Sequence, residues 1–120
     1  MSDNKRESKS KAPSADAETL ARLYATIVAR KGADAGTSYT AKLLAGGPAL
    51  IARKVGEEAV EVTVETLKGD ADALIRESAD LLYHLFVAWA AAGVTPEDVY
   101  GELARREGTS GLAEKAARGK

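Results

Sequence analysis

Two clusters of acidic residues carry the chemistry in this 120-residue sequence. The first, EEAVE, contains Glu57, Glu58 and Glu61, and the second, ESAD, contains Glu77 and Asp80. At about 100° per residue, the three glutamates of EEAVE fall within roughly 100° of one another on a helix and form one acidic stripe. The two acids of ESAD are three residues apart and also share a helix face. Each cluster would therefore present several carboxylates in one direction.

Apolar residues surround both clusters. Val60, Val64 and Leu67 lie around the acidic stripe, which Glu65 extends, and we expect other elements to cover most of this helix so that its carboxylates face inward. Asp80 is followed by the apolar run LLYHLFVAWAAA. An ionised carboxylate in apolar surroundings needs a cationic partner, a raised pKa or a metal ion. Several acids at one place favour a metal.

The lysines near the stripe offer an alternative explanation. Lys54 and Lys68 lie on the same side of the helix as the glutamates and could form ordinary i,i+3 or i,i+4 ion pairs with them. This explanation fits the ESAD cluster less well, because Arg76, its one close basic neighbour in the sequence, points to another side of the helix. A metal site accounts for both clusters, and solvated ion pairs remain the alternative for the first.

The composition excludes several classes of function. A net charge of -1, from 17 basic and 18 acidic residues, offers no broad attraction for a nucleic-acid polymer or an anionic membrane. The absence of cysteine removes disulfides, thiolate zinc sites and cysteine nucleophiles. The polar N-terminus is not a secretory signal, and no apolar run reaches the ~20 residues of a membrane span. We therefore expect a soluble, cytoplasmic protein.

The apolar periodicity and the turn residues predict an all-α fold in a single domain. Helices are expected at residues 16–31, 41–45, 48–68, 71–92 and 96–106. The boundaries expected for the whole chain are a disordered extension at 1–16, the domain at 17–107 and a polar tail or ligand-ordered flap at 108–120. At this length a partner subunit could contribute much of the burial.

The two longest predicted helices, 48–68 and 71–92, should form an antiparallel hairpin, because a tight turn joins them. Glu61 lies about eight residues before this turn and Glu77 about eight after it. Packed helices are only about 8 to 10 Å apart, so acids equidistant from the turn can share an ion. Helical bundles build carboxylate metal sites in this way.

An all-oxygen ligand set favours a hard ion such as Mg²⁺ or Mn²⁺ over zinc or copper. Because Mg²⁺ usually completes its shell with water and substrate phosphate, hydrolysis of a nucleotide phosphoanhydride is the enzymatic hypothesis. The glycines form neither a P-loop nor a dinucleotide-binding fingerprint, and no serine lies in a nucleophile elbow. No competing catalytic motif is therefore visible.

Several other residues have two interpretations. Lys42, Arg53 and Lys54 could bind phosphate oxygens, although each such residue is more often a solvated surface charge. His84 follows Asp80 by four residues and could orient that carboxylate or face the substrate. A histidine whose hydrogen bonds are satisfied in the core explains the position at least as well, so His84 is left outside the metal set.

The pattern EExxE followed by ExxD resembles the all-α nucleotide pyrophosphohydrolases of the MazG type. More specific segments occur in order along the chain: SYTAKLL (38–44), KVGEEAVE (54–61), ADLLYHL (79–85), GVTPEDVYGELARRE (93–107) and GTSGLAEKAAR (108–118). Together they are similar to the phosphoribosyl-ATP pyrophosphatase family, which acts at the second step of histidine biosynthesis. The resemblance spans roughly residues 20–118.

This resemblance implies Mg²⁺-dependent hydrolysis of phosphoribosyl-ATP to phosphoribosyl-AMP and pyrophosphate by a homodimer, which agrees with the wide apolar faces. The implied metal ligands are Glu58, Glu61, Glu77 and Asp80, and Glu57 is a nearby acid that orients or deprotonates water. The motifs also suggest substrate contacts, which are Tyr39, Thr40, Lys42 and Lys115.

Two other functions remain open from the sequence. The first is a housecleaning pyrophosphohydrolase that acts on noncanonical or deoxynucleoside triphosphates, since the acidic pattern alone fits many nucleotides. The second is a non-catalytic helical dimerisation module, whose acids merely solvate a surface. Substrate preference separates the first from our main hypothesis, and the effect of acid substitutions on metal affinity and turnover separates the second.

Overall fold

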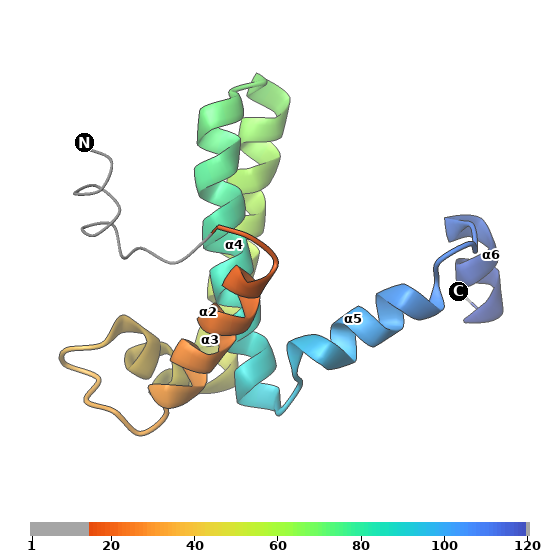
Figure 1. Ribbon diagram of the computed structural model, residues 1–120. Coiled ribbons are helices and arrows are strands. Elements are labelled where there is room, and N and C mark those ends of the chain that lie inside the picture. Colours follow the sequence, from red (N-terminus) through yellow and green to blue (C-terminus); the bar gives the residue numbers. More distant parts are fainter. Residues whose placement is uncertain (1–14, 120) are drawn as a thin grey trace, which may run out of the picture.

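The computed structural model describes residues 15–119, which form helices and no strand (Figure 1). The helices are α2 (Glu18–Ala29), α3 (Tyr39–Lys68), α4 (Ala71–Ala92), α5 (Pro96–Arg105) and α6 (Gly111–Ala117). The predicted all-α class is thus confirmed. The disordered extension expected at residues 1–16 lies outside the described residues, apart from its last two. None of the described helices is long and apolar enough to cross a membrane.

The centre of the fold is the antiparallel hairpin of α3 and α4 (Figure 1). α3 ends at Gly69, whose φ of 74° lies in the left-handed region that glycine adopts without steric cost. α4 begins directly afterwards, because the Asp70 side chain accepts a hydrogen bond from the amide of Ala73 and caps the helix. The hairpin predicted from the sequence is confirmed, including its turn.

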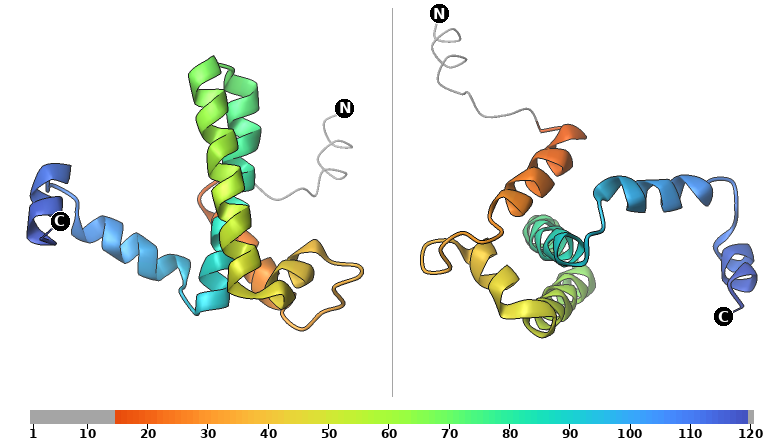
Figure 2. Two further views of the ribbon diagram at one scale, coloured as in Figure 1. Left: turned by 180° about the vertical axis from the view of Figure 1, so that it is seen from behind. Right: turned by 90° about the horizontal axis from the view of Figure 1, so that it is seen from below.

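α3 is bent near its beginning. Gly47 has a φ of 85° and a ψ of 180°, which is not helical, and Pro48 begins the long straight part of the helix. The helices predicted at 41–45 and 48–68 are therefore two parts of one kinked element. The kink turns the first part out of line with the hairpin axis (Figure 2), which brings Tyr39 beside Lys54 and His84.

The hydrophobic core lies at the open end of the hairpin, opposite the turn, where α2 and the first part of α3 pack against α4 (Figures 1 and 2). Its buried members are Ile27, Leu43, Ile51, Phe86, Val87 and Ala90. The Tyr24 hydroxyl links α2 to the segment after α4 by donating a hydrogen bond to the carbonyl of Val94 at 2.8 Å. Trp89 stacks on Phe86 with ring centroids 4.4 Å apart and so packs against the core.

The half of the hairpin near the turn consists of two helices alone in the described chain (Figure 1). Val60 and Leu67 of α3 are 60% and 83% exposed, and Ile75 of α4 is 67% exposed. The expectation that other elements cover most of α3 is wrong for the single chain, because α2 has only 12 residues and packs at the open end. The acidic stripe therefore begins where the packed core ends.

α5 and α6 form an arm that points away from the hairpin (Figures 1 and 2). α5 begins with a capping box formed by Thr95 and Asp98, with Pro96 as the first helical residue. The helix ends one residue before the predicted boundary. Within the segment expected to be a tail or flap, residues 111–117 form α6, whose cap is the Ser110 side chain.

Candidate functional site

The site is built on three carboxylates from the two arms of the hairpin. Glu58 of α3 and Glu77 and Asp80 of α4 each place a carboxylate oxygen so that the three atoms lie within 4.8 Å of one another. Glu77 and Asp80 share a face because they are three residues apart, and the antiparallel packing brings Glu58 opposite them. We call these three residues the acid cluster. It unites three of the four predicted metal ligands.

The fourth predicted ligand, Glu61, lies outside the acid cluster but close to it. Its side chain is exposed, and no carboxylate oxygen of Glu61 joins the three-residue group. Its charge is nevertheless one of the causes that raise the pKa of Glu77. The carboxylate that meets those of Glu77 and Asp80 across the hairpin is that of Glu58 and not that of Glu61.

The electrostatic potential of the acid cluster is negative. The pKa of Glu77 is raised above its ordinary value, first by desolvation and then by the charges of Asp80, Glu61, Glu58 and Glu65. Within residues 15–119, none of the three carboxylates of the cluster forms an ion pair. The cluster therefore attracts a cation that the described chain does not supply.

Glu65 lies on the acidic stripe but outside the predicted ligand set. The Oε1 atom of Glu65 is buried and has no hydrogen-bond partner within residues 15–119. The Lys68 Nζ atom lies 3.9 Å away, which is too far for a hydrogen bond. The position of Glu65 on the helix could have indicated that it belongs with the acids of the site, since it lies one turn beyond Glu61 on the same face.

Glu57 faces the basic side of the site instead of the acid cluster. Its carboxylate lies 3.1 Å from the Lys54 Nζ and 3.5 Å from the Arg53 Nε. The hydrogen bond to Glu57 is the largest cause that raises the pKa of Lys54, followed by the charges of Tyr39 and Glu57. The alternative of ordinary ion pairs thus describes Glu57 and Lys54 correctly, and it does not describe the acid cluster.

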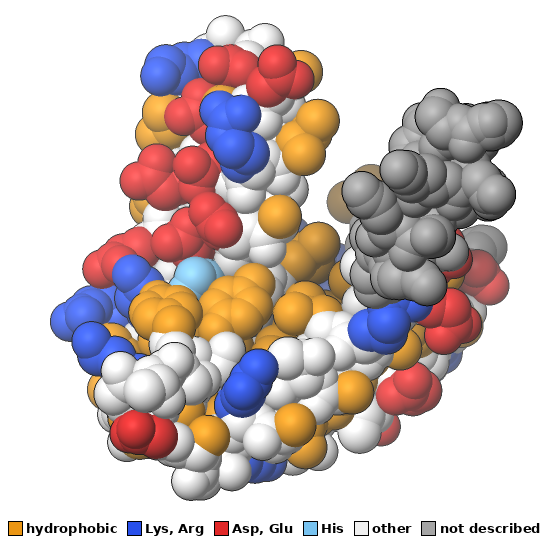
Figure 3. All heavy atoms as spheres, turned by 60° about the vertical axis from the view of Figure 1, so that its left-hand side comes forward, with side chains coloured by type: hydrophobic (Ala, Val, Ile, Leu, Met, Phe, Trp, Pro, Cys, Tyr) orange, Lys and Arg blue, Asp and Glu red, His pale blue; other side chains and the backbone are white. Residues whose placement is uncertain are grey.

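A basic pocket of about 170 Å³ lies beside these ion pairs. Its lining residues are Tyr39, Lys42, Leu43, Leu50, Arg53 and Lys54. Figure 3 shows acidic side chains along one side of the hairpin, leading down to the histidine (pale blue), with basic side chains next to it. Three of the predicted phosphate-binding or substrate-binding cations therefore lie together, adjacent to the acids.

A hydrogen-bonded group of aromatic side chains joins the basic pocket to the acid cluster. His84 is 6% exposed, and its Nδ1 lies 2.8 Å from the carbonyl oxygen of Asp80. Its Nε2 lies 3.1 Å from the Tyr39 hydroxyl, while Thr40 and Tyr83 form a separate hydrogen bond through their hydroxyls. His84 is thus a core histidine with satisfied hydrogen bonds, and it binds the backbone of Asp80 and not its carboxylate.

Lys115 is the predicted substrate residue that the described chain does not bring to the site. It belongs to α6, at the far end of the arm and apart from the hairpin in every view of Figures 1 and 2. A cavity of about 420 Å³ is also remote from the acids. Small apolar residues of α3 and α4 line much of it, together with the Lys31 to Ala33 segment.

The chain matches the family model described as phosphoribosyl-ATP pyrophosphohydrolase over residues 20–107. It is 64% identical over 102 residues to a phosphoribosyl-ATP pyrophosphatase of Azospirillum brasilense, covering 85% of this chain and 92% of the relative. It is 61% identical over 105 residues to one from Parvibaculum lavamentivorans, covering 88% and 96%. A third relative, from Gluconobacter oxydans, is 58% identical over 101 residues, covering 84% and 76%. The matched region contains the acid cluster and the basic pocket.

Proposed function

Because the chain belongs to the phosphoribosyl-ATP pyrophosphohydrolase family, we propose that it hydrolyses phosphoribosyl-ATP to phosphoribosyl-AMP and pyrophosphate, the second step of histidine biosynthesis. The observation that carries this proposal is the acid cluster of Glu58, Glu77 and Asp80. It occupies the EExxE and ExxD positions of the chain and forms no ion pair within the described residues. The cytoplasmic location expected from the sequence stays a prediction.

The acid cluster fits a divalent cation of the Mg²⁺ type, with Mn²⁺ as the second choice. All its donors are carboxylate oxygens, which hard ions prefer. The pKa of Glu77 is raised first by desolvation and then by the charges of neighbouring acids, and a cation would relieve the repulsion among these acids. Glu61 would complete the ligand set by a change of side-chain rotamer, since it already lies near Glu77. A bound ion would polarise the phosphoanhydride and lower the pKa of a bound water.

We propose that Glu57 orients or deprotonates the attacking water. In the structure its carboxylate is shared between Lys54 and Arg53, but half-exposed ion pairs of this kind are weak and exchange readily. Substrate phosphate would compete for the two cations, because charge-assisted hydrogen bonds from lysine and arginine to phosphate are strong. Glu57 would then be released toward the water at the moment the substrate binds.

The basic pocket is the proposed site for the phosphate groups. Lys42, Arg53 and Lys54 converge on it, and Tyr39 and Thr40 stand at the same end of α3. Phosphates in this pocket would lie between these cations and the acid cluster. The scissile phosphoanhydride would thereby be held beside the carboxylates that we assign to the metal.

Homodimerisation would explain two features that the single chain leaves incomplete. The exposed apolar residues near the turn, among them Val60, Leu67 and Ile75, would be covered by a second copy. Lys115 would reach a site only across a subunit boundary, because its own arm points away from the hairpin. Light scattering on the purified protein should give twice the chain mass, and a monomer would remove this part of the proposal.

The experiment that tests the activity offers the purified protein phosphoribosyl-ATP beside a panel of ribonucleoside and deoxyribonucleoside triphosphates, with Mg²⁺. We expect pyrophosphate release that is fastest, in kcat/KM, with phosphoribosyl-ATP, and none after chelation of the metal. Turnover of nucleoside triphosphates alone would indicate a housecleaning pyrophosphohydrolase. No turnover of any nucleotide would indicate a non-catalytic module.

A further inference from the structure

The hydrogen bonds of His84 fix which of its ring nitrogens carries a proton. The carbonyl oxygen of Asp80 can only accept a hydrogen bond, so the Nδ1 atom, 2.8 Å away, is the donor. In the neutral ring Nε2 is then an acceptor, and the Tyr39 hydroxyl, 3.1 Å away, donates to it. The backbone of α4 thus determines where the phenolic proton of Tyr39 points.

Packing supports the same orientation of Tyr39. Its ring stacks on Tyr83 with centroids 6.2 Å apart and meets the His84 ring edge-on at 5.9 Å. The Tyr83 hydroxyl is occupied by Thr40 and does not compete for His84. Tyr39 is 49% exposed, so these contacts are what hold a side chain that is otherwise open to solvent.

Tyr39 therefore presents a hydrogen-bond acceptor to the basic pocket that it lines. Because its proton is donated inward, the phenolic oxygen can offer only lone pairs to a ligand. An ionised phosphate oxygen is also an acceptor and cannot pair with it. A sugar hydroxyl can donate to it, while Lys42, Arg53 and Lys54 bind phosphate.

We propose that His84 is a positioning residue, which holds Tyr39 as a hydrogen-bond acceptor for a hydroxyl of the phosphoribosyl or ribosyl group of the substrate. The proposal rests on the proposed function of this site and assigns a role that the acid pattern does not. It divides the pocket into a hydroxyl-binding wall at Tyr39 and a phosphate-binding wall at the three cations.

The test compares Tyr39→Phe, His84→Leu and the double variant with the unaltered protein, using phosphoribosyl-ATP as the substrate and saturating Mg²⁺. Loss of one hydrogen bond should raise KM by about tenfold in each single variant, with kcat changed by less than about twofold. The double variant should be no worse than either single variant, because both remove the same contact. His84→Gln should restore most of the affinity, since its amide oxygen can accept from Tyr39 near the position of Nε2.

Two controls separate positioning from a loss of packing. Tyr24→Phe also removes a tyrosine hydroxyl, but this hydroxyl lies beside the core and donates to the carbonyl of Val94. This variant should leave KM unchanged. The KM increase of Tyr39→Phe should not depend on salt because no charge is lost, whereas the effect of Lys54→Gln should shrink as ionic strength rises.

An unchanged KM in Tyr39→Phe would overturn the proposal, even if His84→Leu failed to fold. KM increases that multiply to about a hundredfold in the double variant would overturn it as well, because independent contacts are additive in free energy. Failure of the unaltered protein to hydrolyse phosphoribosyl-ATP would instead contradict the proposed function, and the two failures are therefore distinguishable.

Discussion

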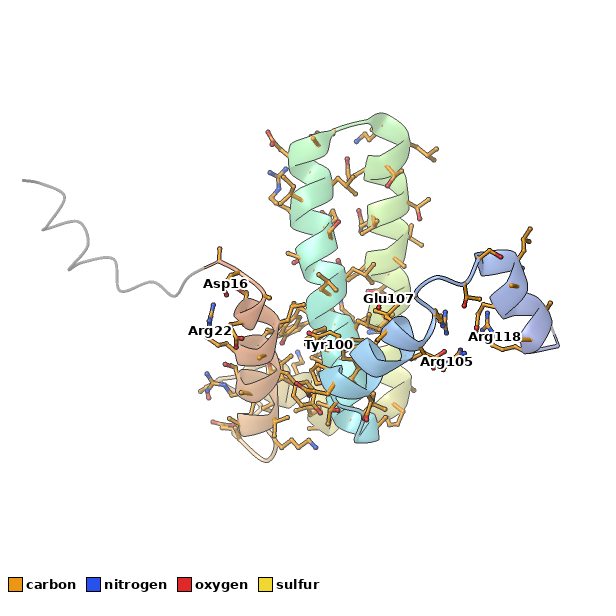
Figure 4. All side chains as sticks on the ribbon, turned by 45° about the vertical axis from the view of Figure 1, so that its right-hand side comes forward. Asp16, Arg22, Tyr100, Arg105, Glu107 and Arg118 are labelled. Carbon is orange, nitrogen blue, oxygen red and sulfur yellow. The ribbon has the colours of Figure 1, made fainter. Side chains whose placement is uncertain are left out.

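The acid cluster of the hairpin and the charged cluster of the α5–α6 arm both gather carboxylates, but only the arm neutralises them. Arg105 Nη2 lies 2.7 Å from both Glu102 and Glu114. Arg106 lies 2.8 Å from Glu102, and Arg118 lies 3.3 Å from Glu114. Figure 4 shows Arg105 and Arg118 near each other where α5 and α6 meet. We call these five residues the arm cluster.

The two clusters differ in the direction of their pKa shifts. Hydrogen bonds from Arg105 and then Arg106 lower the pKa of Glu102 to about 2. Desolvation and neighbouring acids raise the pKa of Glu77. In the arm cluster each carboxylate is thus paired with arginines, and these ion pairs attach α6 to α5. The three carboxylates of the acid cluster form no ion pair within residues 15–119. This difference separates a structural ion cluster from a candidate metal site.

The largest effect that would test the difference between the two clusters is expected at Asp80. We expect Asp80→Asn to lower kcat/KM by about 100-fold or more, because loss of one metal ligand removes several kcal/mol of transition-state stabilisation. The fold should be retained and slightly stabilised without metal, since one repulsive charge is gone. Steady-state assays and thermal unfolding of the same preparation give both quantities.

Asp72→Asn is the matched control for this substitution. Asp72 is an exposed acid in the first turn of the same helix and is not a member of the acid cluster. Its substitution should change kcat/KM by less than about twofold, because surface charges remote from a site contribute little. Equal losses in the two variants would mean that general charge, not ligation, supports activity.

A second prediction concerns stability with and without metal. Mg²⁺ at about 100 times its dissociation constant should stabilise the folded chain by about 2.7 kcal/mol, since the proposed site forms only when the chain is folded. Glu77→Gln should remove most of this gain. Thermal unfolding with Mg²⁺, or with Na⁺ at the same ionic strength, measures it, and an equal gain in the variant would place the metal elsewhere.

The parts of this fold that local chemistry determines were predictable from the sequence. Asp70, Thr95 and Pro48 each specify a helix start through a cap or a fixed φ, and the hairpin register follows from the turn at Gly69. The meeting of Glu58, Glu77 and Asp80 follows from that register. These features need no knowledge of distant contacts.

The features that depend on longer-range packing were not predictable. The exposure of Leu67 depends on how far α2 extends along the hairpin, and the remoteness of Lys115 depends on the direction of the arm. The orientation of Glu57 toward Lys54 reflects a choice between rotamers, which a helical wheel does not determine. His84 was ambiguous because its partner Tyr39 lies 45 residues away in the sequence, on another helix.

A third prediction tests the arm cluster. Glu114 is 4% exposed and accepts from Arg105, so Glu114→Ala should loosen α6 from α5 and remove the ion pair of Arg118 with Glu114. We expect amide exchange in α6 to accelerate by about tenfold or more, with exchange in α3 and α4 unchanged. Mg²⁺ affinity should stay within about twofold in the same variant. Faster exchange throughout the hairpin would show that the two clusters are not separate.

The smallest expected effects are in the pH dependence of stability without metal, where the two clusters should differ in sign. The folded-state pKa of Glu77 is raised above the unfolded value of 4.5, so its carboxylate destabilises the folded chain at neutral pH. That cost disappears as the pH falls through the raised pKa. For Glu102 the folded-state pKa is about 2, so its stabilisation is present above 4.5 and is lost as the pH falls from 4.5 toward 2.

Urea unfolding across this pH range, on the metal-free protein, should separate the two contributions. Relative to Glu77→Gln, the unaltered chain should gain stability on acidification from neutral pH to 4.5, and relative to Glu102→Gln it should lose stability only below 4.5. Both effects should be small, because solvent screens exposed side chains. If Glu77→Gln and the unaltered chain followed parallel curves, the acids of the hairpin would not repel one another, and the need for an external cation would lose its electrostatic basis.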